Sequence, residues 1–339
     1  MTTITTILTT YNRSFLLQRA ISSVRAQTWK DIKIIIRDDC STDDTESVAK
    51  RNASSDTKII YKKSSEKLGA HENIRQGIKD VQTDYFSFLC DDDYLEPNFY
   101  KEGIRLFNKY PDASFVAFRV DHVDINGKYI SSNMENCNEN LEYKYYSSDN
   151  GMQKYLKGLL PGNLTGIIFK KKIAETIDYG DFSEVGYGAD ILFVWRASSR
   201  YNFVVTNFKA GNYTSHSNST SSKMVKYFDE RFIYWWRNRI LTIKNDPDVS
   251  ELNKKFIMKL YMKHPTKSLS GIKYYTHGAI ILILERVKKR QFDELRIDFI
   301  NMNSFISLPI LLIIKLIIVI LVNLKLDEKI RIIIRKMRN

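Results

Sequence analysis

Cysteine, proline and glycine are all scarce in this chain, which has 3, 6 and 14 of them among 339 residues. So little glycine and proline argues against collagen-like and disordered classes. The cysteines Cys40, Cys90 and Cys137 lie far apart and form no Cys-x-x-Cys pair. We therefore expect neither a disulfide framework nor a zinc site, and a reducing compartment fits best. The first residues lack a basic stretch followed by a long apolar core, so no signal peptide is expected.

Positive charge, in contrast, is in excess, with 52 Lys and Arg against 39 Asp and Glu, a formal net charge of +13. Hydrophobic residues at 43% and charged residues at 27% are ordinary for a globular protein. A charge excess of this size indicates an anionic partner, which can be nucleic acid, lipid or a phosphorylated substrate. Because no nucleic-acid-binding motif is present, we expect no nucleic acid among the partners.

Short apolar runs alternate with helical patterns through the first hundred residues. We expect strands at 4–9, 33–37, 58–61 and 85–89, and helices at 15–24, 45–52 and 73–81. This alternation predicts an α/β fold with a mostly parallel central sheet. Such sheets bind ligands beyond the carboxyl ends of their strands, so the polar segments that follow strands are the candidate site.

The pattern changes after the first hundred residues. Strands between 112 and 215 are irregular, and Asn126-Gly127 predicts the turn of a hairpin. From about 228 to 300 the pattern is helical and carries no obvious motif. We therefore expect a helical C-terminal region after the sheet domain.

Asp91, Asp92 and Asp93 follow the apolar run Phe-Ser-Phe-Leu directly. Three adjacent carboxylates repel one another, so the run is costly without a cation. Side chains alternate along a strand, and this predicts that Asp91 and Asp93 face one side. Their oxygens suit Mg²⁺ or Mn²⁺, which can also bind phosphate oxygens. The alternative is a solvated acidic turn before a helix.

A second acidic pair, Asp38-Asp39, follows another buried-type strand. One of these carboxylates can accept a hydrogen bond from a nucleotide base. Helix capping is the alternative, and it explains Ser41-Thr42-Asp43 better than it explains Asp39.

These segments, in this order, resemble the family 2 glycosyltransferases of the GT-A fold, of the kind that builds bacterial cell-surface polysaccharide or teichoic acid. The family shows a strand ending in Tyr-Asn, then Ser-x-x-x-Gln-Thr, Asp-Asp-x-Ser-x-Asp, Gly-x-x-x-Asn and Asp-x-Asp. The matching segments here are Thr10–Asn12, Ser23–Thr28, Asp38–Asp43, Gly69–Asn73 and Asp91–Asp93.

The resemblance implies a nucleotide-sugar donor and a role for each of these segments. Asp39 would hold the base, commonly uracil, and Asp92 would lie near the sugar or ribose. Asp91 and Asp93 would lie at the metal and the diphosphate. Many relatives read Leu-Asp-x-Asp-Asp, so Cys90 stands where their first Asp does, and the choice of two metal ligands stays open. The other implied donor-binding residues are Thr10, Tyr11 and Asn12, around the base, and Asn73, beside the nucleotide.

Two later segments resemble the family more loosely. Asp190, before the apolar run Ile191–Phe193, would be the catalytic base, and Glu184 is the reserve candidate. The alternative for Asp190 is an N-cap of the helix 191–198. His216, in a segment similar to Tyr-Arg-x-His-x-x-Ser, would approach the metal or diphosphate, or would simply be exposed.

The C-terminal segment differs from the rest in composition. Residues 305–322 are apolar apart from Ser307 and Lys315, and the chain from Lys315 onward holds seven Lys or Arg against two Asp or Glu. A spanning helix would bury Lys315 at a cost of about 3 kcal/mol, whereas an in-plane helix leaves it at the surface. We therefore expect cytoplasmic, peripheral attachment to the inner leaflet of the cell membrane. A buried core or oligomer helix is the alternative.

Together these features predict a GT-A catalytic domain at 1–225, a helical extension at 226–303 and a membrane-associating tail at 304–339. The predicted function is an inverting, metal-dependent transfer of a sugar, with UDP the expected nucleotide, to a hydroxyl of a cell-surface or lipid-linked glycan. Mg²⁺ or Mn²⁺ is the expected cofactor, and an oligomer is compatible with the sequence. An inactive nucleotide-sugar-binding scaffold and a nucleotidyltransferase are the alternatives.

Overall fold

The computed structural model describes residues 2–133, 142–156, 164–186, 188–217, 219 and 238–263. The chain divides into two compact units, one made of Met1–Tyr227 with Tyr234–Ile257 and the other of Phe228–Ile233 with Met258–Asn339. The described residues lie almost wholly in the first unit. The expected tail at 304–339 lies outside the described residues, and the domain boundaries expected at 225 and 303 stay predictions.

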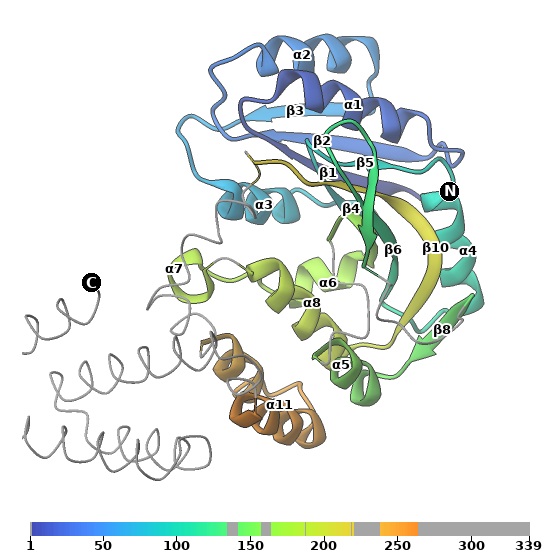
Figure 1. Cartoon of the computed structure of the whole chain (residues 1–339), viewed down its shortest axis with the longest axis vertical. Coiled ribbons are helices and arrows are strands. Elements are labelled where there is room, and N and C mark those ends of the chain that lie inside the picture. The colour runs from blue at the N-terminus through green and yellow to red at the C-terminus, as the bar shows by residue number, and fades with distance from the viewer. Residues whose placement is uncertain are drawn as a thin grey trace, which may run out of the picture. The chain divides into compact units, whose positions relative to one another are not determined.

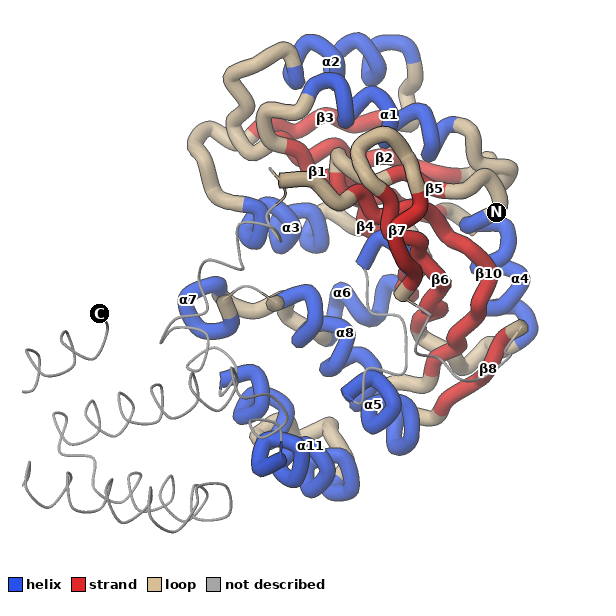
Figure 2. Tube along the Cα trace, in the orientation of Figure 1, coloured by secondary structure: helices blue, strands red, loops and turns tan. Residues whose placement is uncertain are grey.

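The first hundred residues alternate strand and helix as their sequence predicts (Figures 1 and 2). The elements here are β1 (Ile4–Thr10), α1 (Ser14–Arg25), β2 (Ile32–Asp38), α2 (Thr45–Ser55), β3 (Ile59–Lys63), α3 (Ala70–Lys79), β4 (Tyr85–Cys90), β5 (Tyr94–Leu95) and α4 (Phe99–Lys109).

The remaining described elements mix strands with short helices. They are β6 (Phe115–Val123), β7 (Tyr129–Ser132), β8 (Tyr143–Tyr146), α5 (Ser148–Leu156), the 3₁₀ helix η1 (Leu164–Gly166), β9 (Ile167–Lys170), α6 (Lys171–Thr176), α7 (Phe182–Val185), α8 (Ala189–Arg200), β10 (Phe203–Thr214) and α11 (Glu251–Lys263). The predicted hairpin turn at Asn126-Gly127 is confirmed, since β6 and β7 pair antiparallel on either side of it. Gly127 has a φ of 84°, which favours glycine.

All the strands belong to one ten-stranded sheet with the order β3-β2-β1-β4-β9-β6-β10-β5, with β7 paired to β6 and β8 to β10. The pairs β1–β2, β1–β4, β2–β3 and β6–β10 are parallel. Only β9 interrupts the centre, running antiparallel to both β4 and β6. The sheet is therefore mostly parallel at its core, and the predicted α/β class is confirmed.

Strand β1 is buried on both faces because helices cover both sides of the sheet (Figure 1). Ile4 and Leu8 belong to one core cluster with Leu17 of α1. Ile7 points to the other face, where Gly77 of α3 comes so close that a Cβ on it would lie 2.4 Å from Ile7 Cγ2. Central parallel strands with this pattern hold their carboxyl ends rigidly, and those ends carry the candidate site.

Among the described residues, no helix combines the length and the apolar character that crossing a membrane requires.

Candidate active site

The polar segments after β1, β2 and β4 meet at one edge of the sheet. The backbone N–H of Asp39 donates to the Thr10 carbonyl at 3.0 Å, and that of Asp91 donates to the Thr9 carbonyl at 3.1 Å. Residues expected around the donor are thus neighbours, although 81 positions separate Thr10 from Asp91 along the chain. Parallel pairing of β1 with both β2 and β4 is the cause.

Asp91 is buried and its carboxylate is fully engaged by the segment after β1. It accepts hydrogen bonds from Thr10 Oγ1 at 2.8 Å, from the Tyr11 N–H at 3.3 Å and from the Arg13 guanidinium at 2.9 Å. Burial raises the pKa of Asp91 to about 6, although Arg13 opposes the shift. Arg13 also donates to Asp92 at 2.7 Å, so one cation joins both carboxylates.

Arg13 was not among the residues singled out in the sequence. Its position in the same segment as Thr10, Tyr11 and Asn12 was the available signal, because a cation directly after β1 faces the carboxylates that follow β4.

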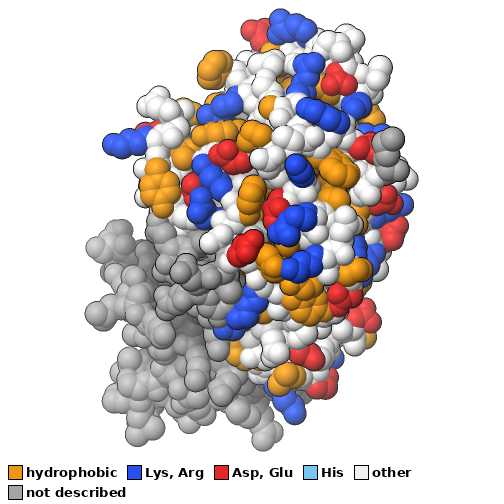
Figure 3. Space-filling view, turned by 90° about the vertical axis from the view of Figure 1, so that its right-hand side faces the viewer, with side chains coloured by type: hydrophobic (Ala, Val, Ile, Leu, Met, Phe, Trp, Pro, Cys, Tyr) orange, Lys and Arg blue, Asp and Glu red, His pale blue; other side chains and the backbone are white. Residues whose placement is uncertain are grey.

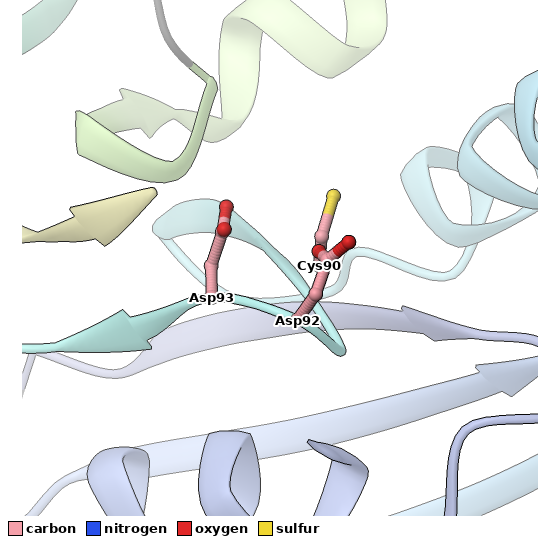
Figure 4. A group of neighbouring side chains, drawn as sticks. All are labelled: Cys90, Asp92 and Asp93. Carbon is pink, nitrogen blue, oxygen red and sulfur yellow. The ribbon is translucent and has the colours of Figure 1, made fainter. Parts of the chain in front are cut away.

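A tight turn follows β4, and it reorients the acidic run. Strand β4 ends at Cys90, and the Asp93 N–H donates back to the Cys90 carbonyl at 3.1 Å. As a result Cys90, Asp92 and Asp93 point to the same side (Figure 4), with one ligand atom of each within 4.8 Å of the others. The structure thus groups Asp93 with Asp92 and the Cys90 thiol, and the expectation that Asp91 and Asp93 face one side stays a prediction.

Asp93 is held by residues far away in the sequence. Its carboxylate accepts from Thr165 Oγ1 at 2.5 Å and from the Thr214 N–H, at the end of β10, at 2.9 Å. Burial, with the negative charge of Asp92 next in effect, raises the pKa of Asp93. Burial and the three neighbouring carboxylates likewise raise the pKa of the Cys90 thiol. Such a crowded acidic group is stabilised by a cation, so the donor set fits a divalent metal.

His216 reaches the same turn from the segment after β10. Its Nε2 lies 3.0 Å from an Asp92 carboxylate oxygen. Arg19 of α1 donates to the Asp92 carbonyl at 2.5 Å and to Thr214 Oγ1 at 2.9 Å. His216 thus lies beside the acidic run, and its approach to a metal or diphosphate stays a prediction. Arg19 carried no recognised signal in the sequence.

The loop before α3 closes on Asp39. The Asp39 carboxylate accepts from the backbone N–H groups of Leu68 at 2.7 Å and Gly69 at 3.0 Å. Burial raises the pKa of Asp39, and these two hydrogen bonds oppose the shift. Lys67 in this loop lies 3.9 Å above the centre of the Tyr11 ring. Asp39 and Tyr11 thus border the same loop, as expected of two base-pocket residues.

Asn12 and Asn73 connect the three segments. Asn12, at a φ of 50°, accepts from the Thr42 N–H at 2.8 Å through Oδ1. Asn73, in α3, donates from Nδ2 to the Arg37 carbonyl at 2.8 Å. Its Oδ1 is buried without a hydrogen-bond partner in the part of the chain that the structure describes. Asn12 thus ties the segment after β1 to the one after β2, and Asn73 ties α3 to the end of β2.

Asp190 lies in the first turn of α8, where Gly188 is the N-cap residue. The alternative that Asp190 itself is the N-cap is therefore wrong. Burial raises its pKa, and the Arg239 guanidinium opposes the shift. Burial raises the pKa of the Tyr179 hydroxyl, and the Asp190 carboxylate adds to the shift. The reserve candidate, Glu184, is exposed.

The fold and this arrangement of loops are those of a GT-A glycosyltransferase. The model of the family "Glycosyl transferase family 2" matches residues 5–176, and the chain belongs to this family. A GalNAc(5)-diNAcBac-PP-undecaprenol beta-1,3-glucosyltransferase from Campylobacter jejuni is 38% identical over 96 residues, which are 28% of this chain and 31% of the relative. The Bacillus subtilis protein described as putative glycosyltransferase EpsH is 26% identical over 163 residues, 48% of this chain and 44% of the relative. The matched stretches thus span less than half of either relative.

Solved structures are similar over a longer stretch. Staphylococcus aureus TarS 1-349, in complex with UDP-GlcNAc, has a TM-score of 0.66 at 15% identity, and the match covers 89% of this chain and 87% of that one. The mannosyltransferase PcManGT from Pyrobaculum calidifontis, in complex with GDP-Man and Mn²⁺, has a TM-score of 0.53 at 13% identity, covering 88% and 85%. At these identities the similarity establishes the fold.

Proposed function

We propose that the protein is an inverting glycosyltransferase that moves a sugar from a UDP-sugar to a hydroxyl of a cell-surface or lipid-linked glycan. The observation that carries this proposal is the meeting of the Asp39 loop and the acidic turn Asp91–Asp93 at one sheet edge. Asp190, partly buried in the first turn of α8, is the candidate base. The Campylobacter jejuni relative is named for an undecaprenol-linked acceptor, and TarS was solved with UDP-GlcNAc. These names support the choice of donor and acceptor class.

The donor base is assigned to the pocket bordered by Thr10, Tyr11, Asn12 and Asp39. Asp39 is buried, yet its carboxylate is held in place by two N–H donors of the loop before α3. A fixed acceptor of this kind suits the N–H of a uracil ring, since a well-placed polar group gives a pocket its specificity. Asn73, with its buried Oδ1, belongs beside the nucleotide.

The diphosphate is assigned to the acidic turn. Asp92 and Asp93 are the carboxylates that best fit a divalent cation, because they lie on one side of the turn. Asp91 instead fixes Arg13, and His216 lies against Asp92. When bound, Mg²⁺ or Mn²⁺ would neutralise negative charge on the departing diphosphate. The Arg13 guanidinium, which contacts Asp91 and Asp92, would add positive charge at the diphosphate.

Asp190 is assigned as the base that takes the proton of the acceptor hydroxyl. As that oxygen bonds to the anomeric carbon and the bond to the diphosphate breaks, the proton moves to a carboxylate oxygen of Asp190. Burial raises the pKa of Asp190, and a base with a raised pKa accepts a proton more readily near neutral pH. Displacement from the opposite face inverts the anomeric centre.

The test is release of nucleotide from a panel of UDP- and GDP-sugars, with a mixture of polyprenyl-linked glycans as acceptors and Mn²⁺ present. Asp190→Asn should lower turnover by about 10²- to 10⁴-fold, the usual contribution of a general base. Asp149→Asn is the matched control, since Asp149 also lies in the first turn of a helix but is exposed. Normal turnover by Asp190→Asn would eliminate Asp190 as the base. Nucleotide binding without turnover in the wild type would favour a binding scaffold instead.

Attachment to the inner membrane surface is proposed for the basic, apolar tail at 304–339. On the face shown in Figure 3, Lys and Arg side chains are interspersed with Asp and Glu and form no patch of one sign. The stretch from Lys315 onward, however, carries a net +5 of the chain's +13. Each such cation contributes about 1 kcal/mol near anionic lipid. Deletion of 304–339 should move the protein from the membrane fraction to the supernatant, and unchanged membrane recovery would end the idea.

A further inference from the structure

Cys90 faces the proposed cation site and brings a ligand atom of a different kind to it. It is the last residue of β4, and the turn that follows directs its Sγ to the side where Asp92 and Asp93 present their oxygens (Figure 4). All three ligand atoms lie within 4.8 Å of one another. Cys90 stands where the resemblance described above puts the first Asp of many relatives.

The two carboxylates beside Cys90 are held from outside the turn. Thr165 Oγ1 and the Thr214 N–H fix Asp93, at 2.5 and 2.9 Å. Arg13 and His216 both contact Asp92, at 2.7 and 3.0 Å. These partners come from three different segments, which follow β1, lie in η1 and lie at the end of β10, so the positions of the oxygens are set by the fold. A cation that binds between them meets the Cys90 sulfur on the same side.

We propose that Cys90 is a direct ligand of the divalent cation, and that the site therefore prefers transition-metal cations over Mg²⁺. This inference rests on the proposed glycosyltransferase function, which places the cation at this turn. Cysteine ligates metals as the thiolate, so its proton leaves to solvent as the cation binds.

The chemistry of the donor set determines the preference. Metal–sulfur bonds of about 2.3 Å and metal–oxygen bonds of about 2.1 Å bring ligand atoms of one cation to roughly 3.5 Å from each other. Because the three ligand atoms already lie within 4.8 Å of one another, a contraction of at most about 1.3 Å is sufficient. Mg²⁺ demands oxygen ligands in near-ideal octahedral geometry, whereas Co²⁺ and Zn²⁺ accept sulfur. Mn²⁺ lies between these extremes in its acceptance of sulfur. A site that includes the Cys90 sulfur would therefore favour Mn²⁺ over Mg²⁺ more strongly than a site with oxygen ligands alone.

Cobalt spectroscopy on the full-length protein tests the proposal without relying on activity. The protein is stripped with EDTA, and Co²⁺ is added with and without UDP. A sulfur-to-cobalt charge-transfer band in the near ultraviolet is expected in the wild type and absent in Cys90→Ser and Cys90→Asp. Cys40→Ser is the matched control and should keep the band, because Cys40 contacts the Ser65 carbonyl instead. Circular dichroism verifies that each variant is folded.

Calorimetric titration gives the metal preference. Cys90→Ser should bind Zn²⁺ about 10- to 100-fold more weakly, the range that perturbing a metal site commonly costs. Cys90→Asp should raise the ratio of Mg²⁺ to Zn²⁺ affinity at least tenfold.

A wild type that binds Co²⁺ without the band, or a band that persists in Cys90→Ser, would overturn the role of Cys90. In either case cation-dependent turnover would leave the proposed function intact. Failure of the protein to bind any divalent cation, even with UDP, would also overturn the proposal that Cys90 is a metal ligand. Failure to turn over any donor while the band is present would instead contradict the glycosyltransferase proposal and support the metal site.

Discussion

Asp91→Asn should stabilise the metal-free protein at alkaline pH while impairing its activity. The folded protein holds Asp91 at a pKa of about 6 against an ordinary value of 3.8, with burial as the largest cause. At about 1.4 kcal/mol per pKa unit, charging Asp91 in the folded state costs about 3 kcal/mol. Asparagine has nearly the same shape and cannot be charged. Its gain will be smaller than 3 kcal/mol, because the ion pair between Arg13 and Asp91 is lost and Asp92 remains as the carboxylate that pairs with Arg13 in this turn.

The sign of the pH dependence follows from linkage. Because the folded pKa is the higher one, the folded state binds the proton more tightly between pH 3.8 and about 6. Stability of the wild type therefore falls as pH rises through this window, and the full cost is present above pH 6. The free energy of unfolding of Asp91→Asn minus that of the wild type should be near its minimum at pH 4. It should be larger by about 2 to 3 kcal/mol at pH 8.

Urea unfolding in EDTA at pH 4.5, 6 and 8 measures this difference, with reversibility verified at each pH. Asp149→Asn, at the exposed first turn of α5, is the control for the loss of a surface carboxylate. Added Mn²⁺ should reduce the difference, since a nearby cation favours the charged form of Asp91. A difference that does not vary with pH, or that decreases toward pH 8, would refute the assignment of a buried, costly carboxylate at this position.

Two further predictions concern the framework around the site. Arg13→Met should destabilise the protein by about 3 kcal/mol at pH 8, because it leaves Asp91 and Asp92 without the cation that joins them. Urea unfolding measures this effect, and Mn²⁺ that restores the stability would indicate that the lost charge is its cause. Gly77→Ala should cost about 1 to 3 kcal/mol, because the new methyl group would overlap Ile7 at the face where α3 packs on β1. A Gly77→Ala protein as stable as the wild type would mean that α3 can move away from the sheet.

The sequence by itself was sufficient for the fold class and for much of the site. Alternating apolar runs and helical patterns depend on local periodicity, so the strands and helices up to Cys90 were predictable. Parallel pairing then brings the post-strand segments together, and this correctly made Asp39, Asp91 and Asn73 neighbours of one edge. His216 was also placed beside the acidic run on a motif alone.

Only the tertiary structure decided how the acidic run is oriented. Strand alternation predicted a shared side for Asp91 and Asp93, whereas the turn after Cys90 groups Asp93 with Asp92 and the Cys90 thiol. Thr165 in η1 and Thr214 at the end of β10, which hold Asp93, lie 72 and 121 positions away from it along the chain. Local patterns carry no information about such contacts, because a hydrogen bond between distant segments depends on how the whole sheet is assembled.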